Sequence, residues 1–357
     1  MSRLNAFRVA YWKLAFFILV VPVAYFYFEN LTVPFLSGES DTTPVVYDSL
    51  TYMNLSREFE GLDGLGIVFL LNRNLLGPIA LVKLLGANSF NILVFNCSLF
   101  YLCLAGLLKT KRIESLAFFI ALTINPLLFA SLTSINKEIL SVCALLLTLT
   151  YTYSGSRRYL AIALLISLFA RQELTLLIVG YSILRQTDSA RLRLIAVLFG
   201  VFAVSLTLPS INDESIRLLY EYQTAESVGL TLFMNRLSEN YAFFLALIPK
   251  IAMNLFGDSV LYFFSGREQD FSFFSAVSGL LFALTIWLAR RSFTLTNDAF
   301  LLIVSYLILF STPAFIHHRY FLPIYVPLAA LAFMKKVAAS SAQVATPNQC
   351  IPGRHGA

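Results

Sequence analysis

Long apolar stretches, interrupted by short clusters of lysine and arginine, run along most of this chain and restrict what it can fold into. Hydrophobic residues make up 58% of its 357 residues and charged residues only 13%, against about 25% charged in soluble domains. A helix needs roughly 20 mostly apolar residues to cross a bilayer, because lipid offers no water to its backbone groups. The sequence therefore predicts an all-α, polytopic transmembrane bundle of about ten spanning helices.

The basic clusters orient these helices, since loops rich in lysine and arginine stay in the cytoplasm. The inner segments hold about 16 of the 26 basic residues but only about three of the 20 acidic ones, so they carry roughly +13 and the outer segments roughly −7. This predicts that both termini are cytoplasmic. The expected helices, besides those near Arg171, cover residues 12–28, 88–108, 115–133, 139–153, 192–209, 271–289, 299–314 and 320–334.

We expect one transmembrane domain over residues 1–336, with outer loops at 29–86 and 210–270, and a short disordered cytoplasmic tail at 337–357. Glycine, proline and charged residues interrupt the apolar runs in the first outer loop and near 241–264. Such interruptions favour interfacial or re-entrant helices over spanning ones. The bilayer is therefore the first predicted partner.

Several classes of function lack the residues they need. The net charge of +6 does not indicate a nucleic-acid partner, because topology already accounts for the basic clusters. The sequence contains no P-loop, GxGxxG, GxSxG or HExxH motif. Its four cysteines show no metal-ligand spacing and are interpreted as packing residues. The cofactor stays unknown, and a divalent cation is left open.

Residues 159–184 are long enough for one span, yet basic residues stand at both ends. Arg157 and Arg158 precede the stretch, Arg185 follows it, and Arg171 lies at its middle. A single crossing would place one basic cluster on the wrong side of the membrane. Two half-length helices that meet at Arg171 keep both clusters inside, so we predict a helical hairpin with its tip at or below the outer surface.

Two outer segments carry residues suited to catalysis. Asp48, among the aromatic residues of 45–52, is the candidate catalytic base, because a carboxylate can accept the proton of a sugar hydroxyl. The alternative is a solvated loop acid. Lys137 can neutralise a lipid phosphate, with Glu138 holding it in place or binding a metal. Here the alternative is an interfacial ion pair that closes a tight turn.

Charged groups at membrane depth are functional candidates by default, because they cost several kcal/mol unless paired or hydrated. Arg171 suits bidentate contact with a phosphate, and the alternative is a structural ion pair with Glu173. A further basic cluster opens the last helix, where adjacent histidines make a weak zinc signal. Contact with phosphate or sugar is the preferred interpretation, and the alternative is that these residues only flank the helix and set its topology. The remaining candidate ligands for substrate or lipid phosphate are Arg73, His317, His318, Arg319 and Tyr320.

Three segments resemble the GT-C superfamily of membrane glycosyltransferases. The segment Tyr47-Asp48-Ser-Leu-Thr-Tyr52 resembles the acidic motif in that superfamily's first outer loop. The helix that follows residues 86–90 and ends in lysine and arginine is similar to its second helix. Residues 318–323, His-Arg-Tyr-Phe-Leu-Pro, look like the Arg-Tyr-x-x-Pro that opens a late helix there. In size and external arginines the chain is also similar to O-antigen (Wzy-type) polymerases.

The resemblance implies transfer or polymerisation of sugars from a polyprenyl-phosphate-linked donor to a glycan acceptor on the periplasmic face of a bacterial inner membrane, with Asp48 as base. We expect no soluble C-terminal domain, and the loop has no paired acidic motif; both depart from the usual pattern and leave metal dependence and acceptor type open. The alternative is a flippase or transporter of a lipid-linked or anionic substrate, which needs a polar path through the bilayer. A non-catalytic membrane subunit is a third reading.

Overall fold

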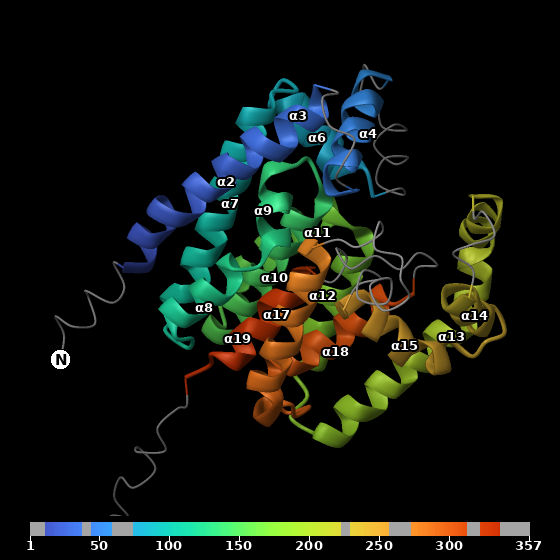
Figure 1. Ribbon diagram of the computed structural model, residues 1–357. Helices are drawn as coiled ribbons and strands as arrows, with labels where there is room; N and C mark the ends of the chain where they lie inside the picture. The colour runs from blue at the N-terminus through green and yellow to red at the C-terminus, as the bar shows by residue number, and fades with distance from the viewer. Residues whose placement is uncertain are drawn as a thin grey trace, which may run out of the picture.

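The computed structural model describes residues 11–37, 44–58, 74–222, 229–256, 273–312 and 322–335. Within these ranges every named element is a helix, which confirms the predicted all-α class, and Ile113 and Met334 form an isolated β-bridge. The elements of Figure 1 are η1 (Phe16–Val20), α2 (Val21–Tyr27), η2 (Phe28–Thr32), α3 (Val33–Leu36), α4 (Pro44–Glu58), α6 (Leu76–Leu84), α7 (Ser89–Lys109), α8 (Ser115–Thr123), α9 (Pro126–Thr133), α10 (Lys137–Ser154), α11 (Arg157–Ala170), α12 (Gln172–Leu184), α13 (Ala190–Tyr222), α14 (Gly229–Glu239), α15 (Phe243–Phe256), α17 (Phe273–Ala289), η4 (Arg290–Ser292), α18 (Asp298–Phe310) and α19 (Leu322–Ala332).

Helix α10 lies at the centre of the bundle and is buried along most of its length (Figure 1). It packs against α7, α11 and α19. Its apolar residues are interspersed with hydroxyl side chains, and Thr148, Thr150 and Thr152 each donate a hydrogen bond to the carbonyl four residues earlier. These bonds satisfy the hydroxyls within the helix itself. Helix α10 can therefore be buried although it carries several hydroxyl side chains.

The predicted helical hairpin around Arg171 is present. Helices α11 and α12 meet at Arg171, whose backbone is extended (φ −158°, ψ 133°). The far end of α12 returns to the far end of α10, because the Tyr181 hydroxyl lies 2.7 Å from Oγ1 of Thr152 and Arg185 donates to the Thr152 carbonyl at 2.7 Å. Helix α11 is therefore antiparallel to both of its neighbours.

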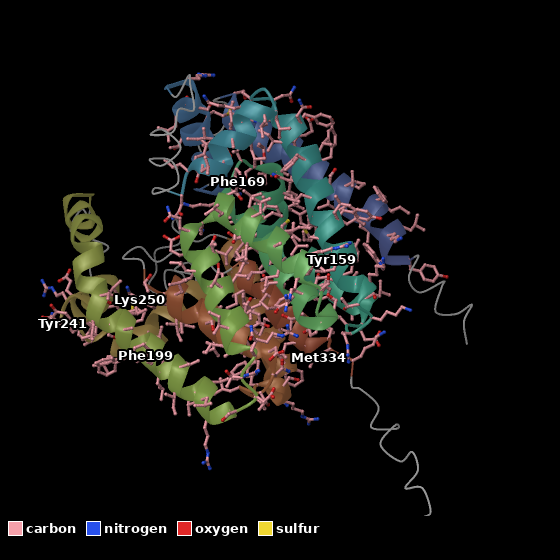
Figure 2. The ribbon with its side chains drawn as sticks, turned by 180° about the vertical axis from the view of Figure 1, so that it is seen from behind. Tyr159, Phe169, Phe199, Tyr241, Lys250 and Met334 are labelled. Carbon is pink, nitrogen blue, oxygen red and sulfur yellow. The ribbon has the colours of Figure 1, made fainter. Side chains whose placement is uncertain are left out.

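Segments far apart in the sequence, most of them basic, gather at one end of the bundle. Arg193 pairs with Asp298 at 3.0 Å, and Arg185 pairs with the same carboxylate at 2.9 Å. Backbone bonds join 112–114 to 333–335, and the Tyr153 hydroxyl donates to the Met334 sulfur at 3.9 Å. We call this region, formed by residues 110–114, 151–158, 185–193, 293–298 and 333–335, the basic end. Figure 2 shows Tyr159 and Met334 toward this end and Phe169 at the other end of α11.

Prolines shape the helices that differ from expectation. The first helix continues from Tyr11 to Leu36, beyond the predicted 12–28, and each of its π-helical segments stops two residues before a proline, Pro22 or Pro34. A proline removes a donor and crowds the preceding turn, which favours such wide turns. The predicted single helix 115–133 is instead two helices bent by 72° at Pro126.

Helix α13 also runs past its predicted end at residue 209, so residues 210–222 are helical rather than an extended polar loop. By length and composition, three helices among the described residues can cross a membrane, Tyr11–Leu36, Ser89–Lys109 and Ala190–Leu208, or four if the bent pair counts as one span. The predicted number of about ten spans is therefore not confirmed. Residues 257–264, part of the predicted re-entrant segment, and the tail at 337–357 lie outside the described residues.

Helices α6 and α11 approach at a glycine. A Cβ atom added at Gly77 would stand 2.1 Å from the carbonyl oxygen of Phe169, which is backbone and cannot rotate away. Only a residue without a side chain allows this contact. The contact fixes where the segment that contains α6 meets the hairpin, close to Arg171.

Replacing Gly77 by alanine is expected to lower the free energy of unfolding by about 1–3 kcal/mol, because the two helices must move apart. Thermal unfolding in detergent measures the effect. Gly106→Ala is the matched control, since its added Cβ would meet nothing closer than 3.6 Å. Equal stability of the two variants would contradict the close approach.

Candidate functional site

A buried ion pair joins the hairpin to α10. Nη2 of Arg171 lies 2.8 Å from Oε1 of Glu138, and the two side chains are only 9% and 2% exposed. The Arg171 guanidinium also lies over the Phe310 ring, 5.6 Å from its centroid, and Phe310 stacks on Tyr306. A cation over an aromatic face is stabilised by the ring quadrupole. We call the region formed by Asn74, residues 132–138, residues 169–173 and Phe310 the Arg171 end.

Glu138 is positioned by the sharp turn that leads into α10. Asn136 caps the helix, because its Oδ1 accepts a hydrogen bond from the Ile139 backbone at 3.2 Å. Asn96, in the middle of α7, donates to the carbonyls of Leu132 and Ser134 and holds the turn from the other side. An acid in the first turn of a helix is favoured by the helix dipole. The local sequence therefore fixes where this carboxylate lies.

The second acid of the hairpin tip has a different partner. Nδ2 of Asn74 lies 3.0 Å from each carboxylate oxygen of Glu173, and Oδ1 of Asn74 accepts the Gln172 backbone N–H at 2.9 Å. Asn74 has a positive φ of 54°, a conformation that asparagine tolerates better than most residues. One side chain thus caps α12 and binds its first acid.

These contacts correct two structural alternatives drawn from the sequence. The alternative in which Arg171 pairs with Glu173 is wrong, because Arg171 pairs with Glu138 and Glu173 binds Asn74. Glu138 was expected to hold Lys137 in place or to bind a metal, with an ion pair that closes the turn as the alternative; its carboxylate forms an ion pair with Arg171. Nearness in sequence did not predict the ion-pair partners, since adjacent residues on a helix point in different directions.

The other predicted residues divide into those near this region and those outside the described ranges. Asp48 lies within α4, which packs against α6 and α9. Lys137 opens α10. The structure therefore brings the α4 backbone at residue 48 and the residues Lys137, Glu138, Arg171 and Glu173 to one end of the bundle. The candidates outside the described residues are Arg73, His317, His318, Arg319 and Tyr320.

Several residues that form the Arg171 end or contact it were missed from the sequence. Ser49 makes two hydrogen bonds with the Ile135 backbone, and no local pattern marked it. Asn96 had a usable signal, because an amide in the middle of an apolar span must find partners. Asn74 and Phe310 had no recognisable signal in the sequence, since the residues that they contact are far away along the chain.

An apolar groove runs between the first helix and α7, with a volume of about 760 Å³. Its wall follows the π-helical segment before Pro22 and the outward face of α7, where Val94 is half-exposed. The other lining residues are mostly aromatic or aliphatic: Phe16, Phe17, Val21, Tyr25, Phe90, Leu93, Cys97, Ser98, Tyr101 and Leu102. The groove therefore suits an apolar chain.

The described part of the chain holds no group of three or more histidine, cysteine, aspartate or glutamate side chains that could bind a metal ion. Its cysteines, Cys97, Cys103 and Cys143, are free and buried, in agreement with their interpretation as packing residues. The divalent cation left open by the sequence has no ligand set among these residues.

Comparison with known proteins gives no relative from which to transfer an activity. The chain matches no family model, no curated protein and no solved structure. The functional argument therefore depends on the residues and geometry of the Arg171 end.

Proposed function

We propose that this chain is a polytopic protein of the bacterial inner membrane that transfers or polymerises sugars from a polyprenyl-phosphate-linked donor at its Arg171 end. The observation that carries the proposal is the buried pair of Arg171 and Glu138 at the end of the bundle opposite the basic end. Membrane insertion is supported by the outer surfaces of its helices, where Phe26, Phe199 and Leu280 are 62%, 69% and 70% exposed. Soluble proteins rarely expose such apolar surface over wide areas.

The basic end supports the proposed orientation. Lysine and arginine near the ends of membrane helices mark the cytoplasmic side. If the basic end lies at the cytoplasmic headgroups, the Arg171 end faces the periplasm. Helices α11 and α12, with 14 and 13 residues, are each about 20 Å long at 1.5 Å per residue. The hydrocarbon core is about 30 Å thick, so the ion pair lies below the outer surface.

Electrostatics at the Arg171 end suit a phosphate group. Two helices, α10 and α12, begin there, and helix N-termini carry partial positive charge. The planar guanidinium of Arg171 can bind two phosphate oxygens at once. Burial strengthens these interactions, because the surroundings have a low dielectric constant. The site is therefore suited to stabilise a phosphate that gains negative charge.

In the proposed reaction Asp48 takes the proton of the acceptor hydroxyl, whose oxygen bonds to the anomeric carbon of the donor sugar. The bond between that carbon and the carrier phosphate oxygen breaks, and the released phosphate keeps the electron pair. Arg171 and Lys137 stabilise this charge, with Arg319 as a further predicted contributor. The apolar groove beside α7 has the lining needed for the isoprenoid chain of the carrier.

A transport function needs polar groups along the whole bundle. In α10, the hydroxyls of Thr148, Thr150 and Thr152 are bonded to their own helix. Among the described residues, the buried charges Glu138, Arg171 and Arg193 lie at the two ends, whereas Lys250, which is also buried, lies in α15 outside both ends. Transport is therefore the outcome that the experiment must distinguish, rather than a second proposal.

Proteoliposomes that contain the purified chain test the proposal. Supplied with polyprenyl-phosphate-linked sugars and a glycan acceptor, they are expected to release free polyprenyl phosphate together with a glycosylated product, both measured by mass spectrometry. Liposomes without protein are the control. Movement of the lipid-linked sugar across the bilayer without any product would reject glycosyl transfer in favour of transport.

Cysteine labelling in intact cells tests which side of the membrane the Arg171 end faces. Only Cys350 is first replaced by alanine, because Cys97, Cys103 and Cys143 are buried and should not react. A membrane-impermeant maleimide is expected to modify Asp48→Cys from outside and to spare Arg158→Cys, which belongs to the basic end. The reverse pattern would place the Arg171 end in the cytoplasm and exclude a periplasmic reaction.

A further inference from the structure

A buried serine hydroxyl joins helix α4 to the turn before α10. Oγ of Ser49 accepts the backbone N–H of Ile135 at 3.0 Å and donates to the carbonyl of the same residue at 3.3 Å. Ser49 is 1% exposed, and the two residues are 86 positions apart in the sequence. We propose that Ser49 is a positioning residue that fixes α4, and with it Asp48, against the start of α10. This inference rests on the proposed role of Asp48 as the base.

Apolar packing surrounds the serine contact but does not replace it. Tyr52, three residues after Ser49, is buried in a small cluster with Val82, Ile92 and Ile135. Residues three apart lie on the same face of a helix, so this face of α4 is the docked one. Apolar contacts are non-directional, whereas the two hydrogen bonds of Ser49 define one register along the turn.

The surface that receives Ser49 leads directly to the ion pair. Ile135 precedes the capping residue Asn136, and Glu138 follows in the first turn of α10. Asn96 holds the turn through the carbonyls on either side of Thr133. A shift of α4 therefore changes its position relative to Glu138 and Arg171 without disturbing that pair.

Position matters because a general base acts only within hydrogen-bond reach of the proton it removes. A misplacement of about 1 Å can lower a rate about 100-fold. Loss of the serine hydroxyl leaves the apolar cluster in place, so a smaller displacement is expected. We expect Ser49→Ala to lower kcat about tenfold or more, with the donor KM changed less than about threefold.

Two variants separate positioning from a general loss of structure. Ser49→Thr keeps the hydroxyl and is expected to restore most of kcat. Ser56→Ala is the matched control on the same helix, because the Ser56 hydroxyl donates to the carbonyl of Met53 at 2.7 Å, within α4 itself. Its kcat is expected to match that of the unmodified chain. Size-exclusion elution in detergent gives the folded fraction by which each kcat is divided.

A cross-linking experiment tests the contact between α4 and Ile135 without a measurement of transfer activity. The variant Tyr52→Cys/Ile135→Cys, in a Cys350→Ala background, is expected to form a disulfide on mild oxidation. The yield is expected to fall severalfold when Ser49→Ala is added. An unchanged yield would overturn the positioning role, whether or not the protein transfers sugar.

The two proposals fail in different ways. If the unmodified chain transfers no sugar while cross-linking depends on Ser49, the proposed function is rejected and the docking role of Ser49 stands. If transfer occurs and Ser49→Ala has the kcat of the unmodified chain, the positioning role is rejected and the proposed function stands.

Discussion

Replacing Arg171 by methionine is expected to lower the free energy of unfolding by about 3–5 kcal/mol. The substitution leaves Glu138, whose side chain is 2% exposed, as a buried charge without its arginine. Methionine retains most of the apolar contact with Phe310, so the loss comes from the charge rather than from packing. Unfolding in detergent followed by intrinsic fluorescence measures the effect.

Arg158→Met is the matched control, because Arg158 is exposed at the basic end and its loss should cost less than about 0.5 kcal/mol. The double variant Arg171→Met/Glu138→Leu is expected to recover most of the stability, since removal of both charges also removes the cost of burying them. A single variant as stable as the unmodified chain would show that the ion pair is not buried.

Transfer activity separates the structural role of Arg171 from its proposed role toward phosphate. The double variant is expected to be folded but inactive, because neither new side chain can stabilise the leaving phosphate. The exchanged pair Arg171→Glu/Glu138→Arg is a more informative charge reversal than an exchange with Glu173, which binds Asn74. Full transfer activity in the folded Arg171→Met/Glu138→Leu variant would leave Arg171 a purely structural role.

Replacing Asp48 by asparagine is expected to lower kcat by about 10²–10⁴, the usual contribution of a general base. Asparagine has nearly the same shape but cannot accept the proton of the acceptor hydroxyl. Membrane insertion and thermal unfolding should stay close to those of the unmodified chain. Initial rates of product formation in proteoliposomes give kcat.

Asp188→Asn is the control for this prediction, because Asp188 is an exposed acid of the basic end and should tolerate the same chemical change without loss of rate. A fully active Asp48→Asn variant would remove the assigned base while leaving the membrane architecture untouched. The reaction would then need another carboxylate at the Arg171 end, and Glu173 would be the next to test.

The sequence predicted the helical class and the break at Arg171, because both depend on local properties. Twenty apolar residues in a row favour a helix wherever they occur, and basic residues on both sides of 159–184 cannot be reconciled with a single crossing. The observed helices 157–170 and 172–184 meet at the predicted position. The extents of the first helix and α13 were wrong, since helices continue through polar residues where composition indicates a loop.

The sequence alone thus determined that apolar helices dominate, that their basic ends would gather, and that ionisable residues near Arg171 needed partners. Only the tertiary structure decided which partners they have: Glu138 for Arg171, Asn74 for Glu173 and Ile135 for Ser49. The physical reason is that a polar side chain has several chemically equivalent partners along the chain. Which of them it meets depends on helix packing, such as the backbone approach at Gly77, and packing brings together residues 33–99 positions apart.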